Sequence, residues 1–449
     1  MACAYSPQIG VADFIITTIL VGVFLFRAAQ KVKQFPITVS YKYYFLGLLF
    51  KLFSVTAFIF IFIYYYNGGD TMSYHEGSVA MRNLFYQSPG HYFDLMFSPI
   101  SLKKYFNYFN SETCYPPTWM VRKEANFTVI RAASVVQLFL PNAVLATSIV
   151  FARIAYGGIF RLYSLFCTYF PGKEKTLAIA FLFMPSVSFW GSGIMKDTLA
   201  LTGICWVIVL VHKMFISKAR ASIFDVVGLL FSVYIIFTVK TYLLLALAPG
   251  LIIWLNFQRL SDIKNTFVKF FLFPVIFVGS VAGLLAFYAA NSDLFGVYGT
   301  DQILSEAAKV QQDLVREEAY GSNSFDIGTF EPTIAGISSK ILPAINAGLF
   351  RPFITESGGS PTMVFAGIEN LILLALFVWA LVKTRVLGFF PYIFSNPLLI
   401  LGFIFTLLLA FSIGLTSANF GALVRYKVPL VPFFTAILLL AIQSRNKEV

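Results

Sequence analysis

A carboxylate that directly follows two glycines is the residue of this sequence best suited to acid–base chemistry. The segment 68–76 reads GGDTMSYHE and begins where a long apolar run ends. Asp70 on this flexible start can act as a general base toward a hydroxyl group, with Tyr74, His75 and Glu76 in support. Alternatively, Asp70, His75 and Glu76 hold a divalent cation such as Mg²⁺ or Mn²⁺. The plainest alternative is that Asp70 caps a helix at the start of a solvated loop.

Basic residues recur at the ends of later apolar runs, where a charge at the membrane edge often serves a function. These residues are Lys196, Lys240, Arg351 and Arg425. Lys196 and Asp197 begin a helix, where a cation is disfavoured, so an anionic ligand would explain Lys196. The alternatives are that Lys240 only extends its ammonium to the membrane surface and that Arg425 only contacts anionic lipid headgroups.

Arg351 and Glu369 form a further group of charged candidate residues. Arg351, in the segment 349–353 (LFRPF), presents a planar guanidinium that suits phosphate. Glu369 lies about two turns into the next apolar run, so it needs a partner or a polar cavity. The simple alternative is that Arg351 and Glu369 pair with each other. Together the cations and Asp70 predict a site for a phosphate-bearing substrate, since cations stabilise the charge that develops as phosphate leaves.

Helices must position these residues, because the composition excludes a soluble protein. Of the 449 residues, 58% are hydrophobic and 12% are charged, whereas soluble domains carry roughly 25% charged residues. Apolar runs of about 20 residues recur along the whole chain, as a hydrocarbon core about 30 Å thick requires. The sequence therefore predicts an all-α polytopic membrane helix bundle with about eleven transmembrane helices, in one membrane domain over residues 1–449.

Recurrent apolar runs define the expected membrane spans. They are residues 11–29, 43–65, 132–152, 176–193, 196–212, 223–239, 241–257, 269–290, 363–382, 397–416 and 426–443. Pro185 lies in the fourth span, where a kink is tolerated. The stretch 154–170 is apolar but holds Arg161 and lies between Arg153 and Lys173. We expect it to form an interfacial helix rather than a span.

Basic residues fix the expected orientation, since they accumulate in cytoplasmic loops. The loops at one set of span ends carry most of the lysines and arginines. This places the N-terminus outside and the C-terminus on the cytoplasmic side. The long loops 66–131 and 291–362 are then extracytoplasmic, with an amphipathic stretch at 92–108 on the outer surface of the membrane. We also expect helices at 301–319 and 332–350, and all the candidate site residues fall on this face.

Charge, cysteines and glycine patterns argue against several other classes. The net charge of +12 is explained by cytoplasmic loops rather than by a nucleic-acid partner. Cys3, Cys114, Cys167 and Cys205 show neither metal-ligand spacing nor a disulfide framework. The N-terminus lacks the basic region and cleavage site of a signal peptide, so we expect the first apolar run to be retained. The sequence contains neither standard glycine pattern of a nucleotide-binding loop.

The order of these features resembles the GT-C superfamily of polyprenyl-phosphate-sugar glycosyltransferases. An acidic residue in a large outer loop, amphipathic juxtamembrane helices and basic residues at later outer helix ends carry the resemblance. It implies that Asp70 is the catalytic base and that some of the four cations bind the donor phosphate. The acidic loop here follows the second predicted span, and the usual acidic pair is reduced to one Asp. The segments 185–199 (PSVSFWGSGIMKDTL) and 348–353 (GLFRPF) also resemble membrane proteins of bacterial surface-polysaccharide clusters.

The GT-C resemblance implies that a sugar moves from a polyprenyl-phosphate-linked donor to a glycan or lipid acceptor on the extracytoplasmic face. Asp70 would then deprotonate the acceptor hydroxyl. Two alternatives stay open. A polymerase or ligase of O-antigen or exopolysaccharide would depend more on Arg351 and Arg425. A flippase or transporter of lipid-linked glycans would place charges near mid-membrane on broken helices, where Glu369 is the main candidate.

Overall fold

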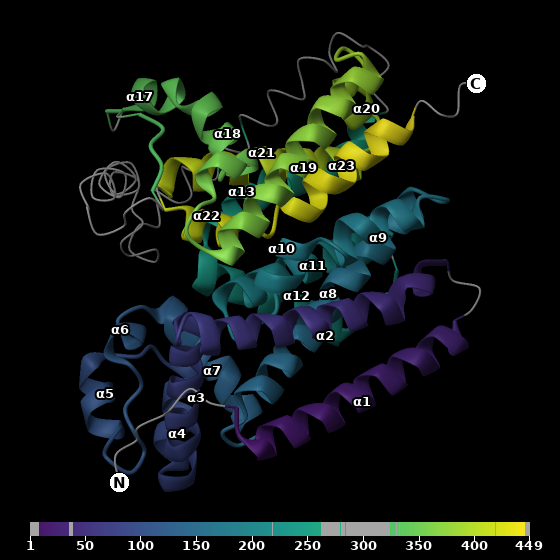
Figure 1. The fold of residues 1–449 in the computed structure, drawn as a ribbon. Coiled ribbons are helices and arrows are strands. Elements are labelled where there is room, and N and C mark those ends of the chain that lie inside the picture. The colour runs from purple at the N-terminus through teal and green to yellow at the C-terminus, as the bar shows by residue number, and fades with distance from the viewer. Residues whose placement is uncertain are drawn as a thin grey trace. The chain divides into compact units, whose positions relative to one another are not determined.

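The computed structural model is helical throughout its regular elements (Figure 1), which confirms the predicted all-α class. It describes residues 9–35, 39–217, 219–261, 324–328, 330–331, 333–417 and 419–444, and the single positions 279 and 283. The chain divides into two compact units, Met1–Thr241 (unit 1) and Tyr242–Val449 (unit 2). The predicted helices at 269–290 and 301–319 lie outside the described residues, apart from positions 279 and 283.

Within the described residues, seven helices are long and apolar enough to cross a membrane. They are α1 (Val11–Gln34), α2 with its flanking turns (Ser40–Tyr65), α8 (Val144–Tyr169), α11 with η3 (Lys196–Ile216), α12 (Ile223–Lys240), α19 (Pro361–Thr384) and α21 (Pro397–Thr416). The helices α22 (Phe420–Tyr426) and α23 (Val431–Ser444) are bent by 67° and add an eighth span if they cross together. The chain is therefore a multi-pass helical membrane protein.

Shorter helices complete unit 1. They are η1 (Val39–Tyr43), α2 proper (Tyr44–Phe60), the π-helical turn η2 (Ile61–Tyr65), α3 (Asp70–Gln87), α4 (Pro89–Phe97), α5 (Leu102–Tyr108), α6 (Thr118–Val121), α7 (Glu124–Gln137), α9 (Glu174–Leu182) and α10 (Pro185–Trp190), with α11 proper at Lys196–Val211 and η3 at His212–Ile216. We call the helices α3–α7, between the spans α2 and α8, the lobe. Its helices α4 and α5 run across the direction of α2 (Figure 1).

The predicted span 132–152 is wrong, because the chain breaks inside it. Helix α7 ends at Gln137 and α8 begins at Val144. Between them Asn142 has a φ of 57°, a left-handed conformation that cannot continue a right-handed helix. Helix α8 then runs without interruption through the stretch predicted to be interfacial, 154–170, and ends at Tyr169.

The predicted span 176–193 consists of two short helices, α9 and α10. Pro185 occupies the first turn of α10, a position where its missing N–H is not needed. Neither helix has the roughly 20 residues needed to cross a bilayer alone. The turn 191–195 follows α10 and leads directly into α11.

A buried carboxylate joins the first helix to α8. Asp13 accepts hydrogen bonds from the backbone N–H groups of Leu145 and Ala146, each at 2.9 Å. These amides lie in the first turn of α8, where N–H groups have no partner within the helix and an anion is favoured. Asp13 therefore caps α8 from another element.

Unit 2 is built on close helix packing around α21. Its remaining helices are α13 (Tyr242–Ser261), α17 (Ile334–Ser339), α18 (Ile341–Phe350), η6 (Ile354–Glu356) and α20 (Phe389–Phe394). A Cβ atom at Gly348 would collide with the carbonyl oxygen of Ala410, and one at Gly414 with that of Ala344. Glycine thus lets the backbones of α18 and α21 touch, as is common between membrane helices.

One cysteine departs from expectation. Cys114, in the lobe, is disulfide-bonded, so the prediction that the sequence implies no disulfide is wrong. Cys167 in α8 and Cys205 in α11 are free thiols, and Cys3 lies outside the described residues. Spacing along the chain did not show the bond, because cysteines far apart in sequence pair only after folding. Disulfides persist mainly in oxidising compartments.

Candidate functional site

The candidate base Asp70 stands at the first position of α3, directly after a reversal of the chain. Asn67, Gly68 and Gly69 have φ angles of 51°, 129° and 105°, so this reversal uses left-handed backbone that glycine adopts most easily. The cap position is Gly69, and Asp70 lies in the first helical turn. A carboxylate there is stabilised by the helix macrodipole. Asp70 is half-buried.

A hydrogen bond brings the start of α3 to the turn 191–195, which directly precedes Lys196. The Thr71 hydroxyl donates to the Ile194 carbonyl oxygen at 3.3 Å, and the Thr198 hydroxyl donates to the Gly193 carbonyl oxygen at 2.8 Å. Thr71 adjoins Asp70, and Ile194 lies two residues before Lys196. The first turn of α3 therefore meets the turn that leads into α11, and each of these two helices carries a half-buried charged residue at its first position.

A buried ion pair lies at the same start of α11. Lys240 Nζ is 2.5 Å from Asp197 Oδ1, and the two side chains are 5% and 1% exposed. Lys240 ends α12 and Asp197 occupies the first turn of α11, so the pair joins the two helices. Asp197 therefore balances the charge of Lys240, so this lysine is not an isolated cation.

The residues that follow Asp70 turn into the core of the lobe. The Tyr74 hydroxyl donates to Asn126 Oδ1 at 3.2 Å, and His75 Nδ1 lies 3.2 Å from Gln137 Nε2. Burial, with repulsion from Arg82, lowers the pKa of His75 to about 3. Burial also raises the pKa of Glu76. These side chains thus shape the lobe, and His75 is neutral near pH 7.

No metal centre is evident in the described part of the chain, where no three His, Cys, Asp or Glu side chains gather. The arrangement of α3 gives the reason. Asp70 is half-buried at the end of the helix, whereas His75 is fully buried against α7. Two side chains five positions apart on a helix point in different directions.

Sequence reasoning missed a lysine inside the second span. Lys51 is buried in α2, and its ammonium donates to the carbonyl oxygens of Gly191 at 2.8 Å and Val187 at 3.2 Å. Val187 lies in the last turn of α10, and Gly191 is the first residue of the turn 191–195. The signal was present, since a single ionisable residue inside an apolar run is a functional candidate by default.

Arg351, in unit 2, contacts a carboxylate, a backbone carbonyl and two aromatic rings. Its Nη2 atom is 2.8 Å from Glu356 Oε1, and its Nη1 atom donates to the Asp326 carbonyl oxygen at 3.1 Å. The guanidinium lies over the rings of Phe325 and Phe353, 5.3 Å and 5.8 Å from their centroids. Its carboxylate partner is therefore Glu356, rather than the Glu369 of the simple alternative.

A second buried lysine, Lys427, contacts the backbone of Arg351. Lys427 donates to Asn370 Oδ1 at 2.6 Å and to the Arg351 carbonyl oxygen at 2.9 Å. Glu369 is buried and acts electrostatically on Lys427, which gives this intramembrane carboxylate a counter-charge. Arg425 is half-buried in α22, two residues before Lys427.

The predicted site residues thus form one group in each unit. Unit 1 holds an acid, Asp70, at the start of α3, and a cation, Lys196, at the start of α11. A hydrogen bond from Thr71 joins the start of α3 to the turn before α11, and the buried pair of Lys240 and Asp197 lies in the first turn of α11. Such a group can accept a proton and neutralise an anion. Unit 2 holds Arg351 and Arg425 around Lys427 and Glu369. Comparison with protein-family models, curated proteins and solved structures finds no match to this chain.

Proposed function

We propose that this chain is a glycosyltransferase of the GT-C type in the bacterial inner membrane. It moves a sugar from a polyprenyl-phosphate-linked donor to a hydroxyl of a glycan or lipid acceptor on the extracytoplasmic face. The observation that carries this proposal is the hydrogen bond from Thr71 to the Ile194 carbonyl oxygen. It joins the helix start that bears Asp70 to the turn that leads directly into Lys196.

The chemistry assigns one role to each side of this junction. Asp70 takes the proton of the acceptor hydroxyl as its oxygen bonds to the anomeric carbon of the sugar. The bond between that carbon and the phosphate oxygen breaks, and its electron pair leaves with the phosphate. Lys196 stabilises the negative charge that develops there. The surrounding apolar helices suit the polyprenyl chain of the donor.

The proposed orientation has the lobe outside the cell and the N-terminus on the same side. The disulfide at Cys114 supports it, because a stable disulfide fits an extracytoplasmic compartment. Lys31 and Lys33 in the last turn of α1 support it from the other end, since cytoplasmic loops collect basic residues. The proposed total is about eleven spans, of which the described residues hold seven or eight candidates.

A polymerase or ligase of lipid-linked polysaccharide is the second candidate. It is favoured by Arg351, whose half-buried guanidinium lies over two phenylalanine rings in unit 2. A planar guanidinium of this kind suits a diphosphate. In that function Arg351 and Arg425 bind the substrate, and Asp70 is dispensable.

The test compares Asp70→Asn with Glu112→Gln, a matched loss of an exposed carboxylate from the same lobe. Purified protein in detergent receives a panel of undecaprenyl-phosphate-linked hexoses and a glycan acceptor, and product is measured by mass spectrometry. We expect Asp70→Asn to lower kcat by roughly 100-fold or more, as for a lost general base, and Glu112→Gln to retain activity. Full activity of Asp70→Asn would reject the proposed base and favour the polymerase or ligase.

The candidate phosphate ligand is tested separately. Lys196→Met should raise the KM for the lipid-linked donor by roughly tenfold, the loss of about 1.4 kcal/mol of binding, whereas Lys103→Met in the lobe should not. Since detergent abolishes any gradient, product formation there also excludes a pure flippase or transporter. Wild-type protein that moves lipid-linked glycan in vesicles but forms no product would overturn the transferase.

A further inference from the structure

Three basic side chains of the spans α1 and α8 gather around Tyr44, the first residue of α2. The ammonium of Lys31 lies over the Tyr44 ring, 5.6 Å from its centroid, and Arg153 Nη2 donates to the Tyr44 hydroxyl at 3.3 Å. Arg161 acts electrostatically on both Lys31 and Tyr44. The three cations come from two spans that are distant in sequence, so only the folded chain brings them together. We call Lys31, Arg153 and Arg161 the cation cluster.

The cation cluster has no carboxylate partner in the part of the chain that the structure describes. No acidic residue occurs between Asp13 and Asp70 or between Glu124 and Glu174, so the last turns of α1, the whole of α2 and the whole of α8 contain none. Arg153 and Arg161 also repel Lys31. A charge within an apolar span needs a partner, and these three helices do not supply a negative one.

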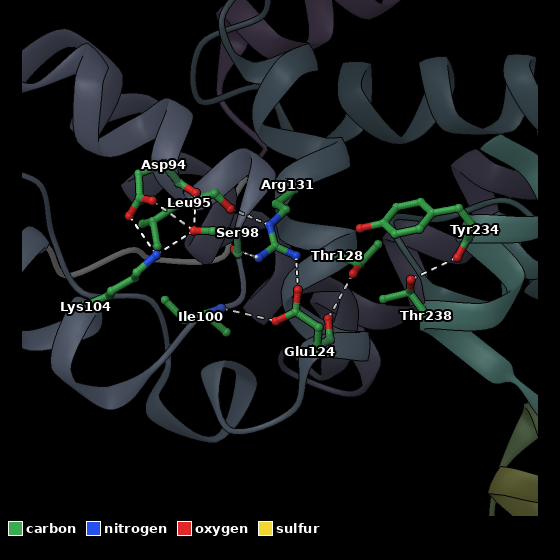
Figure 2. A network of polar contacts seen from close by, with 10 residues as sticks. All are labelled: Asp94, Leu95, Ser98, Ile100, Lys104, Glu124, Thr128, Arg131, Tyr234 and Thr238. Atoms are coloured by element: carbon green, nitrogen blue, oxygen red, sulfur yellow. Dashed lines mark hydrogen bonds and ion pairs between the residues drawn. The ribbon is translucent and has the colours of Figure 1, made fainter. Parts of the chain in front are cut away.

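Other cations of the protein have the partners that the cluster lacks. Carboxylates pair with several cations of unit 1: Arg131 with Glu124 and Lys104 with Asp94 in the lobe (Figure 2), Lys240 with Asp197, and Lys213 with Asp225. Buried Lys51 donates to two carbonyl oxygens. By contrast, the hydrogen bond of Arg153 to a described residue goes to the neutral Tyr44 hydroxyl, although a guanidinium has five donors.

The surface around Arg153 leaves room for an anion. A Cβ built on Gly157 would lie 3.8 Å from Arg153 Nη1 and within 4 Å of no other described atom outside the backbone of α8. The side of α8 next to the guanidinium is therefore open. Arg153 is half-buried, whereas Lys31 and Arg161 are exposed, so a ligand can reach the cluster from the surface of α1 and α8.

The apolar surface beside the cluster suits acyl chains. The buried side chains of α1 are Asp13, Thr17 and Ala28, so most of its apolar side chains face lipid when α1 crosses the membrane. Phe24 extends this surface to Arg153, whose guanidinium lies 5.9 Å from the Phe24 ring centroid. A phospholipid joins a negative phosphate to apolar chains, and basic sites between transmembrane helices bind such headgroups.

We propose that the cation cluster binds the phosphate of an anionic phospholipid such as phosphatidylglycerol. The lipid lies in the leaflet at the Lys31 end of α1, which is the cytoplasmic leaflet in the proposed orientation. Arg153 lies about 12 Å further into the span than Arg161, so it approaches the phosphate from the membrane interior. Lys31 and Arg161 approach it from the surface, and the acyl chains lie along α1. The inference holds whether or not the chain transfers sugars.

Native mass spectrometry of the full chain in detergent tests this site. The protein is titrated with dioleoyl phosphatidylglycerol, with dioleoyl phosphatidylethanolamine as the matched lipid without net charge, and with glycerol phosphate as the anion without acyl chains. Lys31→Gln and Arg161→Gln each remove one exposed cation of the cluster. Lys33→Gln removes an exposed lysine from the same turn of α1 and is the matched control. A circular-dichroism spectrum equal to that of the wild type establishes that each variant is folded.

We expect the wild type to bind phosphatidylglycerol roughly tenfold more tightly than phosphatidylethanolamine. Lys31→Gln and Arg161→Gln should each raise the Kd for phosphatidylglycerol roughly fivefold, the loss expected for one basic residue at an anionic headgroup, and Lys33→Gln should leave it unchanged. Equal weakening by Lys33→Gln would overturn the inference, because any basic residue at this surface would then serve. Equal affinity for the two lipids would also overturn it, as would glycerol phosphate that binds as tightly as the lipid.

Discussion

Buried cations in this protein are bonded largely to backbone carbonyls near helix ends. Lys51 binds carbonyls at the end of α10, Arg131 binds those at the end of α4, and Lys427 binds the carbonyl of Arg351, just after α18. Carbonyls in the last turn of a helix have no partner within it, and they carry the negative end of the macrodipole. The cation and the carbonyls thus satisfy each other where water is scarce.

We predict that Lys51→Met loosens the turn 191–195 that precedes Lys196. The carbonyls of Val187 and Gly191 lose a charged donor, and hydrogen bonds to charged groups contribute about 1.5–3 kcal/mol. Amide hydrogen exchange in the turn should therefore be about 10–100-fold faster. Lys103→Met, which removes an exposed lysine, serves as the control. Unchanged exchange in the turn of Lys51→Met would show that the lysine does not hold it.

We predict that the lobe loses stability in mild acid because of His75. Its pKa falls from 6.5 in the unfolded chain to about 3 in the folded protein, so the unfolded chain binds the proton first as the pH decreases. Stability then falls by up to about 1.4 kcal/mol per pH unit. From about pH 7 to about pH 5 the loss is about 2 kcal/mol, measured by hydrogen exchange of α3 and α7 after correction for intrinsic rates.

The variant His75→Gln isolates this effect. It removes the titrating ring, so the free energy of local unfolding should vary much less over this range, whereas His91→Gln at an exposed position should keep the wild-type slope. Glu76 acts in the opposite sense, since its raised pKa makes the folded state bind a proton more readily than the unfolded chain. A wild-type slope that persists in His75→Gln would assign the acid sensitivity to another group.

At the scale of elements, glycine sets the distance between α18 and α21. We predict that Gly348→Ala and Gly414→Ala each destabilise unit 2, because the new methyl group meets a backbone carbonyl that cannot rotate away. Overpacking of this kind costs about 1–3 kcal/mol. Gly358→Ala is the control, since a Cβ there meets no atom within 4 Å. Thermal unfolding in detergent measures the effect, and equal melting temperatures for all three variants would contradict it.

Apolar runs predicted most of the long helices but not where the chain breaks. The run over 132–152 is continuously apolar, yet the left-handed backbone at Asn142 divides it. Hydropathy averaged over residues carries no information about backbone conformation, so it did not predict this break. The opposite error occurred at 154–170. Arg161 argued against a span, but its guanidinium lies 5.2 Å from the centroid of the Trp206 ring, a partner from a distant helix.

The candidate site was predictable in its parts and not in its assembly. Asp70 and Lys196 stand at the ends of apolar runs, so their positions along the chain identified them. The contact that joins their helices, from Thr71 to Ile194, links residues 123 positions apart, and no local pattern indicates it. The partner of Arg351 was missed for a different reason. Glu356 reaches Arg351 because the chain turns after Pro352. The separation of the two residues along the sequence did not reveal this turn.

At the scale of the whole molecule, the accessibility of Cys114 and Cys167 to a labelling reagent tests the proposed orientation in the membrane. We predict that a membrane-impermeant maleimide labels Cys114 in intact cells only after reduction, because Cys114 is disulfide-bonded in the lobe that we place outside. Cys167, in the last turn of α8, should stay unlabelled until the cells are opened. Mass spectrometry locates the label. Labelling of Cys167 in intact cells, with Cys114 protected, would invert the proposed orientation.

The bond between Asp13 and the first turn of α8 has a consequence for biosynthesis. Asp13 precedes Leu145 by 132 residues, and translation adds about 5–20 residues per second, so α1 waits on the order of ten seconds for its partner. During this interval α1 has been made but lacks the two amides that anchor its carboxylate. The order of synthesis therefore produces α1 well before the helix start that anchors it. A ribosome stalled before residue 144 would leave α1 without this anchor, held, within the described residues, only by its packing on α2 and η1.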